Sequence, residues 1–346
     1  MLSRISRSTP LALALLLLVL TLLVDVFGSN GLERTATEIL IRVVMVVGMW
    51  IFIGNSGVIS FGHTAFMCIG AYAAAWFTVP PMMKQLFLPG LPDFILQNSW
   101  SFLPSALVAI VFASLIAVFI GLVIMRLSGI AASIATFAML AIVNVVYSNW
   151  ESVTAATSSV VGIPMYATLW LTLFSAIICI IVAWIYAQSR FGLALRAARE
   201  EPIGAQASGI DIFRQRLLAF VISSAVVAYA GVLQAHYIGV VNPGAFYLSI
   251  TFTALAMLVV GGMHSLSGAV LGVLVITVMI ELFVRFEDGI TVAGVAVQLP
   301  SGIQEIAVGL LMILILVKRP SGLTNNREIA LRSMFSDRFN KSLKNK

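Results

Sequence analysis

The sequence predicts an all-α, polytopic membrane protein, a bundle of about ten membrane-spanning helices that forms one domain over residues 1–346. Two observations predict this class. Of the 346 residues, 60% are hydrophobic and only 10% are charged, whereas soluble domains carry about 25% charged residues. The apolar residues also gather in runs that can cross a hydrocarbon core about 30 Å thick. We infer that lipid is the solvent for most of the surface.

Ten apolar runs are the predicted spans. The first follows Arg4 and Arg7, as in a secretory signal, but no good small-x-small cleavage site comes after it, so we predict an uncleaved first helix. Glycine, proline and polar residues interrupt the edges of the second, third and eighth runs. The ten runs cover residues 11–27, 38–54, 60–79, 102–125, 129–148, 166–187, 215–236, 246–262, 266–284 and 302–317.

The distribution of basic residues predicts that both termini are cytoplasmic. When the N-terminus is placed inside and the chain alternates through ten spans, most of the 20 Lys and Arg residues fall on inner segments, which is the usual bias in membrane proteins. The net charge of +6 therefore indicates topology, and we expect no nucleic-acid partner. With five spans in each half, the halves run in opposite directions, so we predict two inverted five-helix halves.

The inner segment 188–216 is longer than a connector between adjacent spans needs to be. Pro202 separates two predicted short helices at 192–201 and 203–208, and Gly209 ends the second. Two interpretations stay open. The segment is either a coupling helix that docks into a cytoplasmic motor, or an amphipathic helix on the membrane surface with its arginines toward lipid head groups. The residues expected to contact a motor are Arg196, Arg199, Glu200, Glu201 and Gly209.

A polar cluster opens the third span and comprises Asn55, Ser60 and His63. Unpaired polar groups are costly in lipid, so these side chains either pair or face water. They are therefore candidates for the translocation path, and the alternative is hydrogen bonding between closely packed helices. The glycines expected to permit such close packing are Gly57, Gly62, Gly70, Gly261, Gly262 and Gly268.

The sequence offers little for catalysis or for a cofactor of its own. It has no Gly-Lys pair and hence no phosphate-cradling Walker A loop, so if transport is driven by ATP, another chain must hydrolyse it. The three histidines do not have a metal-binding spacing. Cys68 and Cys179 lie in apolar runs, as buried small hydrophobic residues do. We predict a protein that is not an enzyme and that binds no metal.

Four motifs occur in order along the chain. They are Asn55-Ser56-Gly57 with Ser60-Phe61-Gly62-His63; Arg190-Phe191-Gly192 with Ala198-Arg199-Glu200-Glu201-Pro202; Gly261-Gly262-Met263 with Ser267-Gly268; and Arg319-Pro320 with Gly322-Leu323. Together they resemble the LivM-type permeases of branched-chain amino-acid ABC transporters, over roughly residues 35–325. Three departures stand out: Thr154–Ser159 replace a Gly-rich segment, His264 replaces a Gly, and Gln206 replaces an acidic residue.

The resemblance implies a bacterial inner-membrane importer with several subunits. The expected partners are two ABC ATPase subunits, a second permease subunit, an extracytoplasmic solute-binding protein and the membrane lipid. The implied cargo is a branched-chain or other small amino acid, with urea or short amides as an alternative. In another class, a self-contained secondary transporter or channel would work without an ATPase, but no carboxylate is well centred in a span for proton coupling. A membrane-bound enzyme has little support.

Three further features carry expectations. Glu38 and Arg42 stand four residues apart and should pair on one helix face. The outer loops 80–101 and 149–165 face an extracytoplasmic partner or serve only as connectors. The basic tail 324–346 is expected to bind the membrane surface or the motor, with disorder of its last residues as the alternative.

Overall fold

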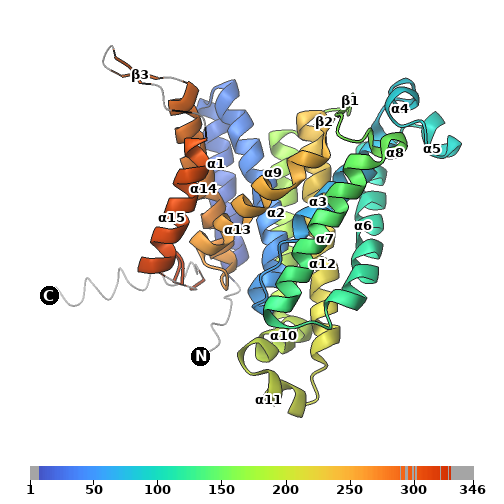
Figure 1. Ribbon diagram of the computed structural model, residues 1–346. Coiled ribbons are helices and arrows are strands. Elements are labelled where there is room, and N and C mark those ends of the chain that lie inside the picture. Colours follow the sequence, from blue (N-terminus) through green and yellow to red (C-terminus); the bar gives the residue numbers. More distant parts are fainter. Residues whose placement is uncertain are drawn as a thin grey trace.

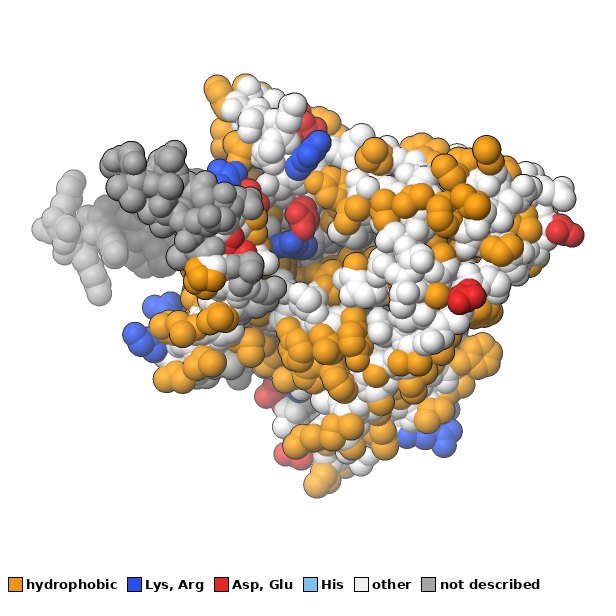
Figure 2. Space-filling model, turned by 45° about the horizontal axis from the view of Figure 1, so that its top comes forward, with side chains coloured by type: hydrophobic (Ala, Val, Ile, Leu, Met, Phe, Trp, Pro, Cys, Tyr) orange, Lys and Arg blue, Asp and Glu red, His pale blue; other side chains and the backbone are white. Residues whose placement is uncertain are grey.

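The structure is a computed structural model that describes residues 8–288, 290–292, 295–297, 300, 302–319, 321–325 and 327–328. Within these ranges the chain is a bundle of long helices with two small antiparallel ribbons, β1–β2 and β3–β4 (Figure 1). The prediction of an all-α membrane bundle is confirmed. Hydrophobic side chains cover much of the face seen in Figure 2, and the charged side chains on it are few and scattered.

The helices and strands follow one another with short connections. In chain order they are α1 (Thr9–Phe27), α2 (Asn30–Ser56), α3 (His63–Thr78), α4 (Pro81–Phe87), α5 (Asp93–Gln97), α6 (Phe102–Ile124), α7 (Gly129–Asn149), α8 (Glu151–Thr154), β1 (Val160–Val161), α9 (Leu169–Gln188), α10 (Arg190–Glu200), α11 (Pro202–Ala207), α12 (Ile212–Ile238), β2 (Val240–Val241), η1 (Pro243–Phe246), α13 (Leu248–Gly261), α14 (Leu266–Asp288), β3 (Ile290–Val292), β4 (Val295–Val297) and α15 (Ile303–Lys318).

Among the described residues, eight helices are long and apolar enough to cross a membrane. They are α1, α2, α6, α7, α9, α12, α14, and α13 taken together with η1. Helices α3 and α15 occupy the two other predicted spans, with 16 residues each. Each is about 24 Å long, which is shorter than the hydrocarbon core. The count of ten spans therefore stays a prediction.

The bundle has two distinct ends. Helices α10 and α11 lie at one end, which we call the α10 end, and α4, α5, α8 and the β1–β2 ribbon lie at the other, the α4 end (Figure 1). Helix α2 finishes at the α10 end, where Arg199 bonds to the carbonyl of Gly54. Helix α12 finishes at the α4 end, where the Tyr237 hydroxyl donates to the carbonyl of Arg34. The two helices are thus antiparallel.

The order of the elements agrees with the predicted inverted halves. Helices α2 and α12 have 27 residues each, and α6 and α14 have 23 each. Helix α3 packs on α6 and α7, as α13 packs on α14 and α15, while α6 contacts α12 as α14 contacts α2. Both 27-residue helices end at a glycine in the left-handed conformation, Gly57 (φ 71°) and Gly239 (φ 78°). These features are those expected of an inverted repeat, which stays a prediction.

Backbones approach closely in the centre of the bundle, where α3 lies against α12. A Cβ on Gly70 would lie 2.2 Å from the carbonyl oxygen of Ala228, and one on Gly231 would lie 1.9 Å from that of Met67. Only glycine permits contact at these distances. The predicted pairing of Glu38 with Arg42 is confirmed, and Arg42 also bonds to the hydroxyl of Thr277 on α14.

The two predicted outer loops pack against each other at the α4 end. The amide of Gly90 donates to the carbonyl of Ser152 over 2.8 Å. The buried Lys84 ammonium donates to the carbonyls of Ile95 (2.8 Å) and Asn98 (2.6 Å). Burial lowers the pKa of Lys84 to about 8. The first loop therefore has a polar core of its own.

Candidate coupling and translocation site

The segment 188–216 folds into α10, α11 and the first turn of α12. The Ser189 hydroxyl accepts a hydrogen bond from the amide of Gly192 at the start of α10, as an N-cap does. Pro202 occupies the first position of α11. Gly209 has φ 81°, a left-handed conformation that ends the helical run before Asp211 caps α12. Both short helices begin and end within two residues of their predicted limits.

Arg199 points into the bundle. Its Nη1 donates to the carbonyl of Gly54 over 2.7 Å, and its side chain is only 16% exposed. A Cβ on Gly57 would lie 2.7 Å from Cγ of Arg199, so the arginine stem rests on that glycine. The Arg199 guanidinium also bonds to Glu200, which it holds at a pKa below the usual value. The contact fastens α10 to the last turn of α2, and we call it the α2–α10 junction.

Arg196 also turns toward the bundle. Its Nη2 donates over 2.6 Å to the carbonyl of Ala187 in the last turn of α9, where helical carbonyls lack partners. Burial lowers the pKa of this guanidinium. The structure places Arg196 and Arg199 against the ends of α9 and α2, where carbonyl groups accept their hydrogen bonds. Their contact with a motor stays a prediction.

The outward face of this segment carries other residues. Glu200 has a side chain that is 62% exposed, and Glu201 at the end of α10 is exposed as well. Ile203 in α11 is a large apolar side chain with 78% of its surface exposed. Gly209 lies beyond it, and a Cβ there would meet nothing within 4 Å. Sequence reasoning missed Ile203, whose position directly after Pro202 was the available signal.

Asn55, Ser60 and His63 are all buried. Asn55 Nδ2 donates to the carbonyl of Ile51 over 3.0 Å, and Ser60 Oγ lies 2.8 Å from Nδ1 of His63. The His63 ring lies 5.4 Å from the ring of Phe52. It lies at the same distance from a second phenylalanine ring on α12. In this conformation the three residues pack within the bundle and do not line an open path.

Two polar atoms in this cluster lack partners. Oδ1 of Asn55 and Nε2 of His63 are buried and have no hydrogen-bond partner among the described residues. Such atoms are costly to bury. The start of α3 therefore carries unused hydrogen-bonding capacity beside the α2–α10 junction.

The break between α2 and α3 spans residues 57–62 and packs on α7. A Cβ on Gly62 would lie 2.7 Å from the carbonyl oxygen of Thr136. The amide of Phe61 donates to the hydroxyl of the same threonine over 3.3 Å. Just beyond the break, the hydroxyls of Thr64 and Thr251 lie 2.5 Å apart. The first turns of α3 and α13 thus meet inside the bundle.

The turn between α13 and α14 is clasped by the segment that follows α15. A Cβ on Gly261 would lie 1.9 Å from the carbonyl oxygen of Gly268, and one on Gly322 would lie 2.5 Å from Cα of Gly262. The hydroxyl of Thr324 donates to the carbonyl of Gly261 over 2.9 Å. Two motifs that are far apart in the sequence are therefore one packed unit, which we call the C-terminal clasp.

An acidic residue completes the C-terminal clasp. The carboxylate of Glu328 accepts hydrogen bonds from the amides of Leu266 (2.7 Å) and Ser267 (3.0 Å) at the start of α14, a favourable place for negative charge. Sequence reasoning missed this role because the tail was considered for its basic and apolar residues, and Glu328 is neither. The predicted tail beyond it, residues 329–346, lies outside the described residues.

The α2–α10 junction and the C-terminal clasp are in contact. A Cβ on Gly54 would lie 2.8 Å from the carbonyl oxygen of Met263, which follows the Gly261-Gly262 pair. Sequence reasoning missed Gly54. Among the residues that the structure describes, no group of three or more His, Cys, Asp or Glu side chains is placed to hold a metal ion.

Comparison with known proteins identifies sequences that are similar to this chain. The model of the family described as branched-chain amino acid transport system, permease component, matches residues 31–316. The high-affinity branched-chain amino acid transport system permease protein LivM of Escherichia coli (strain K12) is 25% identical over 341 residues, covering 89% of this chain and 73% of the relative. LivH of the same organism is 31% identical over 165 residues, covering 48% of this chain and 49% of the relative.

An archaeal relative extends the comparison. The probable branched-chain amino acid transport permease protein LivM of Methanocaldococcus jannaschii is 33% identical over 162 residues, covering 46% of this chain and 47% of the relative. No solved structure matches the chain. The match to the family model includes α2 to α14, and therefore both the α2–α10 junction and the polar cluster at the start of α3.

Proposed function

Because the chain belongs to the family of branched-chain amino acid transport permeases, we propose that it is the membrane-spanning subunit of an ATP-driven importer for branched-chain or other small amino acids. The observation that carries this proposal is the family match over residues 31–316. The name of the Escherichia coli LivM protein supports the choice of cargo. The coarser statement, a multi-pass membrane permease, follows from the family and the apolar helices alone.

The proposed importer needs other subunits to hydrolyse ATP, to complete the path and to deliver the cargo. Its ATP is hydrolysed by separate ABC ATPase subunits, because the sequence has no Walker A loop. A second permease of similar kind completes the path, and an extracytoplasmic binding protein delivers the cargo to the α4 end. We place both termini and the α10 end in the cytoplasm of a bacterial-type inner membrane, as the basic residues favour.

The ATPase contacts the exposed side of α10 and α11, and Arg199 carries the movement inward. Arg199 donates a hydrogen bond to the carbonyl of Gly54, and its side-chain stem packs against Gly57. A shift of α10 therefore pulls on the last turn of α2 and on the break at 57–62. That break leads directly to Ser60 and His63. The polar start of α3 is thus the first part of the path to respond.

Reconstitution tests this function. The chain is placed in proteoliposomes with its second permease and ATPase subunits, ATP is enclosed, and uptake of radiolabelled leucine is measured with the binding protein outside. We expect uptake that requires both ATP and the ATPase subunits. Uptake by this chain alone, without ATP, would show instead a secondary transporter or channel. Uptake of urea in place of leucine would keep the importer and replace the cargo.

A further inference from the structure

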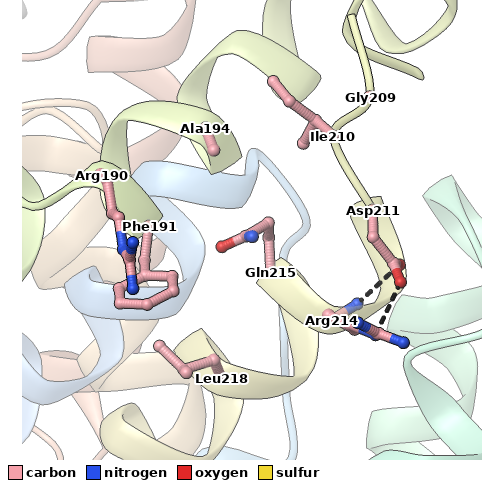
Figure 3. Close-up of a pocket in the computed structure, with 9 residues that line it drawn as sticks. All are labelled: Arg190, Phe191, Ala194, Gly209, Ile210, Asp211, Arg214, Gln215 and Leu218. Atoms are coloured by element: carbon pink, nitrogen blue, oxygen red, sulfur yellow. Dashed lines mark hydrogen bonds and ion pairs between the residues drawn. The ribbon is translucent and has the colours of Figure 1, made fainter. Parts of the chain in front are cut away.

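A cavity of about 520 Å³ lies between α10 and the start of α12. Figure 3 shows Phe191 and Ala194 on its α10 side, Gln215 and Leu218 on its α12 side, and Ile210 in the connection above them. Sites for small organic molecules typically have volumes of about 300–1,000 Å³ and mostly apolar walls with a few placed polar groups. This cavity meets both criteria.

Arg190 supplies a positive charge to the cavity. Its guanidinium lies over the ring of Phe191, with Cζ 4.8 Å from the ring centroid. The ion pairs found among the described residues do not include Arg190. A guanidinium that lies over an aromatic ring can bind a carboxylate through two parallel hydrogen bonds. Arg190 is therefore available to an anionic group.

Gln215 offers a hydrogen-bond acceptor on the opposite wall. Its Oε1 is buried and has no partner among the described residues. In Figure 3 the side-chain amide points across the cavity toward Phe191 and Arg190. A buried acceptor without a partner is unfavourable, so a rotation of this amide that turns Oε1 toward an ammonium group in the cavity would be stabilising.

The rest of the lining includes four apolar side chains. They are Phe191, Ala194, Ile210 and Leu218. The other charged residues at the cavity, Asp211 and Arg214, pair with each other, with 2.9 Å between Oδ2 and Nε. Among the described residues, the cavity therefore combines a cation outside the ion pairs, an acceptor without a partner and apolar side chains. This set is the complement of a zwitterion with an apolar side chain.

We propose that this cavity binds the transported amino acid from the cytoplasmic side. The carboxylate binds Arg190, the ammonium group binds Oε1 of Gln215, and the aliphatic side chain lies on Phe191 and Leu218. This inference rests on the proposed function for its ligand and its sidedness. It adds a second site for the cargo, separate from the path through the membrane.

Occupation of the cavity restrains transport. A ligand there touches α10 and α12 at once, and α10 is the helix that the α2–α10 junction connects to the break at 57–62. The ligand therefore holds α10 in its present position against the movement that the ATPase imposes. Cargo that accumulates inside slows its own uptake.

Equilibrium binding tests the site directly. The complete permease and ATPase complex, without binding protein, is placed in nanodiscs and titrated with radiolabelled leucine. We expect saturable binding that weakens at least about tenfold in Arg190→Ala and in Gln215→Leu. Arg190→Lys should weaken it less, because the charge is kept and only the paired hydrogen bonds are lost.

Arg126 provides a matched control. Its guanidinium also lies over an aromatic ring, 5.7 Å from the centroid of Phe213, but it does not line the cavity. Arg126→Ala should bind leucine as the wild type does. The proposal is overturned if Arg126→Ala weakens leucine binding as much as Arg190→Ala does, or if leucine binding does not depend on Arg190. A phospholipid that occupies the cavity through Arg190 and is not displaced by leucine overturns it as well.

Transport provides the second readout. Proteoliposomes of the full complex are loaded with ATP, either with or without leucine inside. For each variant, the initial rate of uptake with internal leucine is compared with the rate without it. We expect internal leucine to lower the rate at least about twofold in the wild type and in Arg126→Ala, and not in Arg190→Ala. If the initial rate of uptake does not change with internal leucine, this inference alone is overturned. Absence of any leucine uptake overturns the proposed cargo instead.

Discussion

The two 27-residue helices α2 and α12 end in the same way but continue in different surroundings. Each ends at a left-handed glycine, Gly57 or Gly239, and each is followed by an irregular stretch that leads to a shorter helix. At Gly57 the side chain of Arg199 reaches the chain from α10. After Gly239 the chain pairs with β1, and Asn242 bonds to the carbonyl of Thr157. The first break is thus contacted from the α10 end and the second from the α4 end.

Under the proposed function, this difference would separate two tasks of the permease. The break at 57–62 is connected to the segment that an ATPase would move, whereas the break at 239–247 is connected to the loops that a binding protein would meet. The first turns of the helices after each break meet at Thr64 and Thr251. A disturbance at either end can therefore reach the same place in the bundle.

The largest expected effect is at the first break. Gly57→Ala places a side chain at φ 71° and 2.7 Å from Cγ of Arg199. Gly239→Ala has φ 78° but its nearest contact is 3.4 Å. Both variants bear the cost of a left-handed alanine, about 1–2 kcal/mol, and only the first also displaces Arg199. We expect ATP-driven leucine uptake to fall at least about tenfold more in Gly57→Ala. Equal losses in the two variants would remove the distinction between the breaks.

The next largest effect is expected when the hydrogen bond between Arg199 and Gly54 is removed. Arg199→Ala leaves the carbonyl of Gly54 without its 2.7 Å partner. We expect uptake to fall about tenfold while ATP hydrolysis continues, because the motor no longer pulls on α2. Uptake and ATPase activity are measured on the same proteoliposomes. Arg285→Ala, which removes an exposed arginine paired with Glu281, is the control and should change neither. Parallel loss of both activities in Arg199→Ala would indicate a docking role.

A smaller effect is expected at the second break. Asn242 caps η1 by accepting from the amide of Gly244 over 2.8 Å, and it donates to Thr157 over 2.9 Å. Asn242→Ala should lower the stability of the complex by about 1 kcal/mol. It should also weaken stimulation by the binding protein without uncoupling ATP hydrolysis from uptake. Thermal unfolding and ATPase assays with and without binding protein measure the two effects. Uncoupling in this variant would contradict the assignment of this break to the α4 end.

The smallest effect concerns pH at the α4 end. The pKa of Lys84 is lowered to about 8 by burial, from 10.5 in the unfolded chain. Between these two values the unfolded state holds more protons, so the contribution of Lys84 to stability rises with pH. The Tm of the wild type minus the Tm of Lys84→Met should therefore rise from pH 7 to pH 9.5. A constant difference would show that Lys84 keeps an ordinary pKa.

Much of the bundle could be predicted from the sequence because lipid imposes long apolar runs. The α10–α11 segment was also predictable, since Pro202 and Gly209 are local signals that act within one turn. The pairing of Glu38 with Arg42 follows from helix geometry alone. Each of these features depends on residues that are close together in the chain.

The features that escaped prediction depend on contacts between distant segments. Short helices give no sign of which face meets the bundle, so the inward direction of Arg196 and Arg199 could not be foreseen. The halves share no evident sequence repeat, and so the likeness of Gly57 and Gly239 emerged only from the backbone. The packing of Gly322 on Gly262 joins positions 60 residues apart, beyond the reach of any local pattern.

The C-terminal clasp also sets an order on biosynthesis. Ribosomes make the chain from its N-terminus, so the turn at 261–268 is finished well before residues 322–328 are added. Until then, the amides that Glu328 will accept from, and the carbonyl that Thr324 will bond, have no partner from the tail. The α10 end of the bundle therefore closes only after residues 322–328 have been added. A chain that stops before residue 322 lacks these contacts, and the turn at 261–268 then stays uncovered by them.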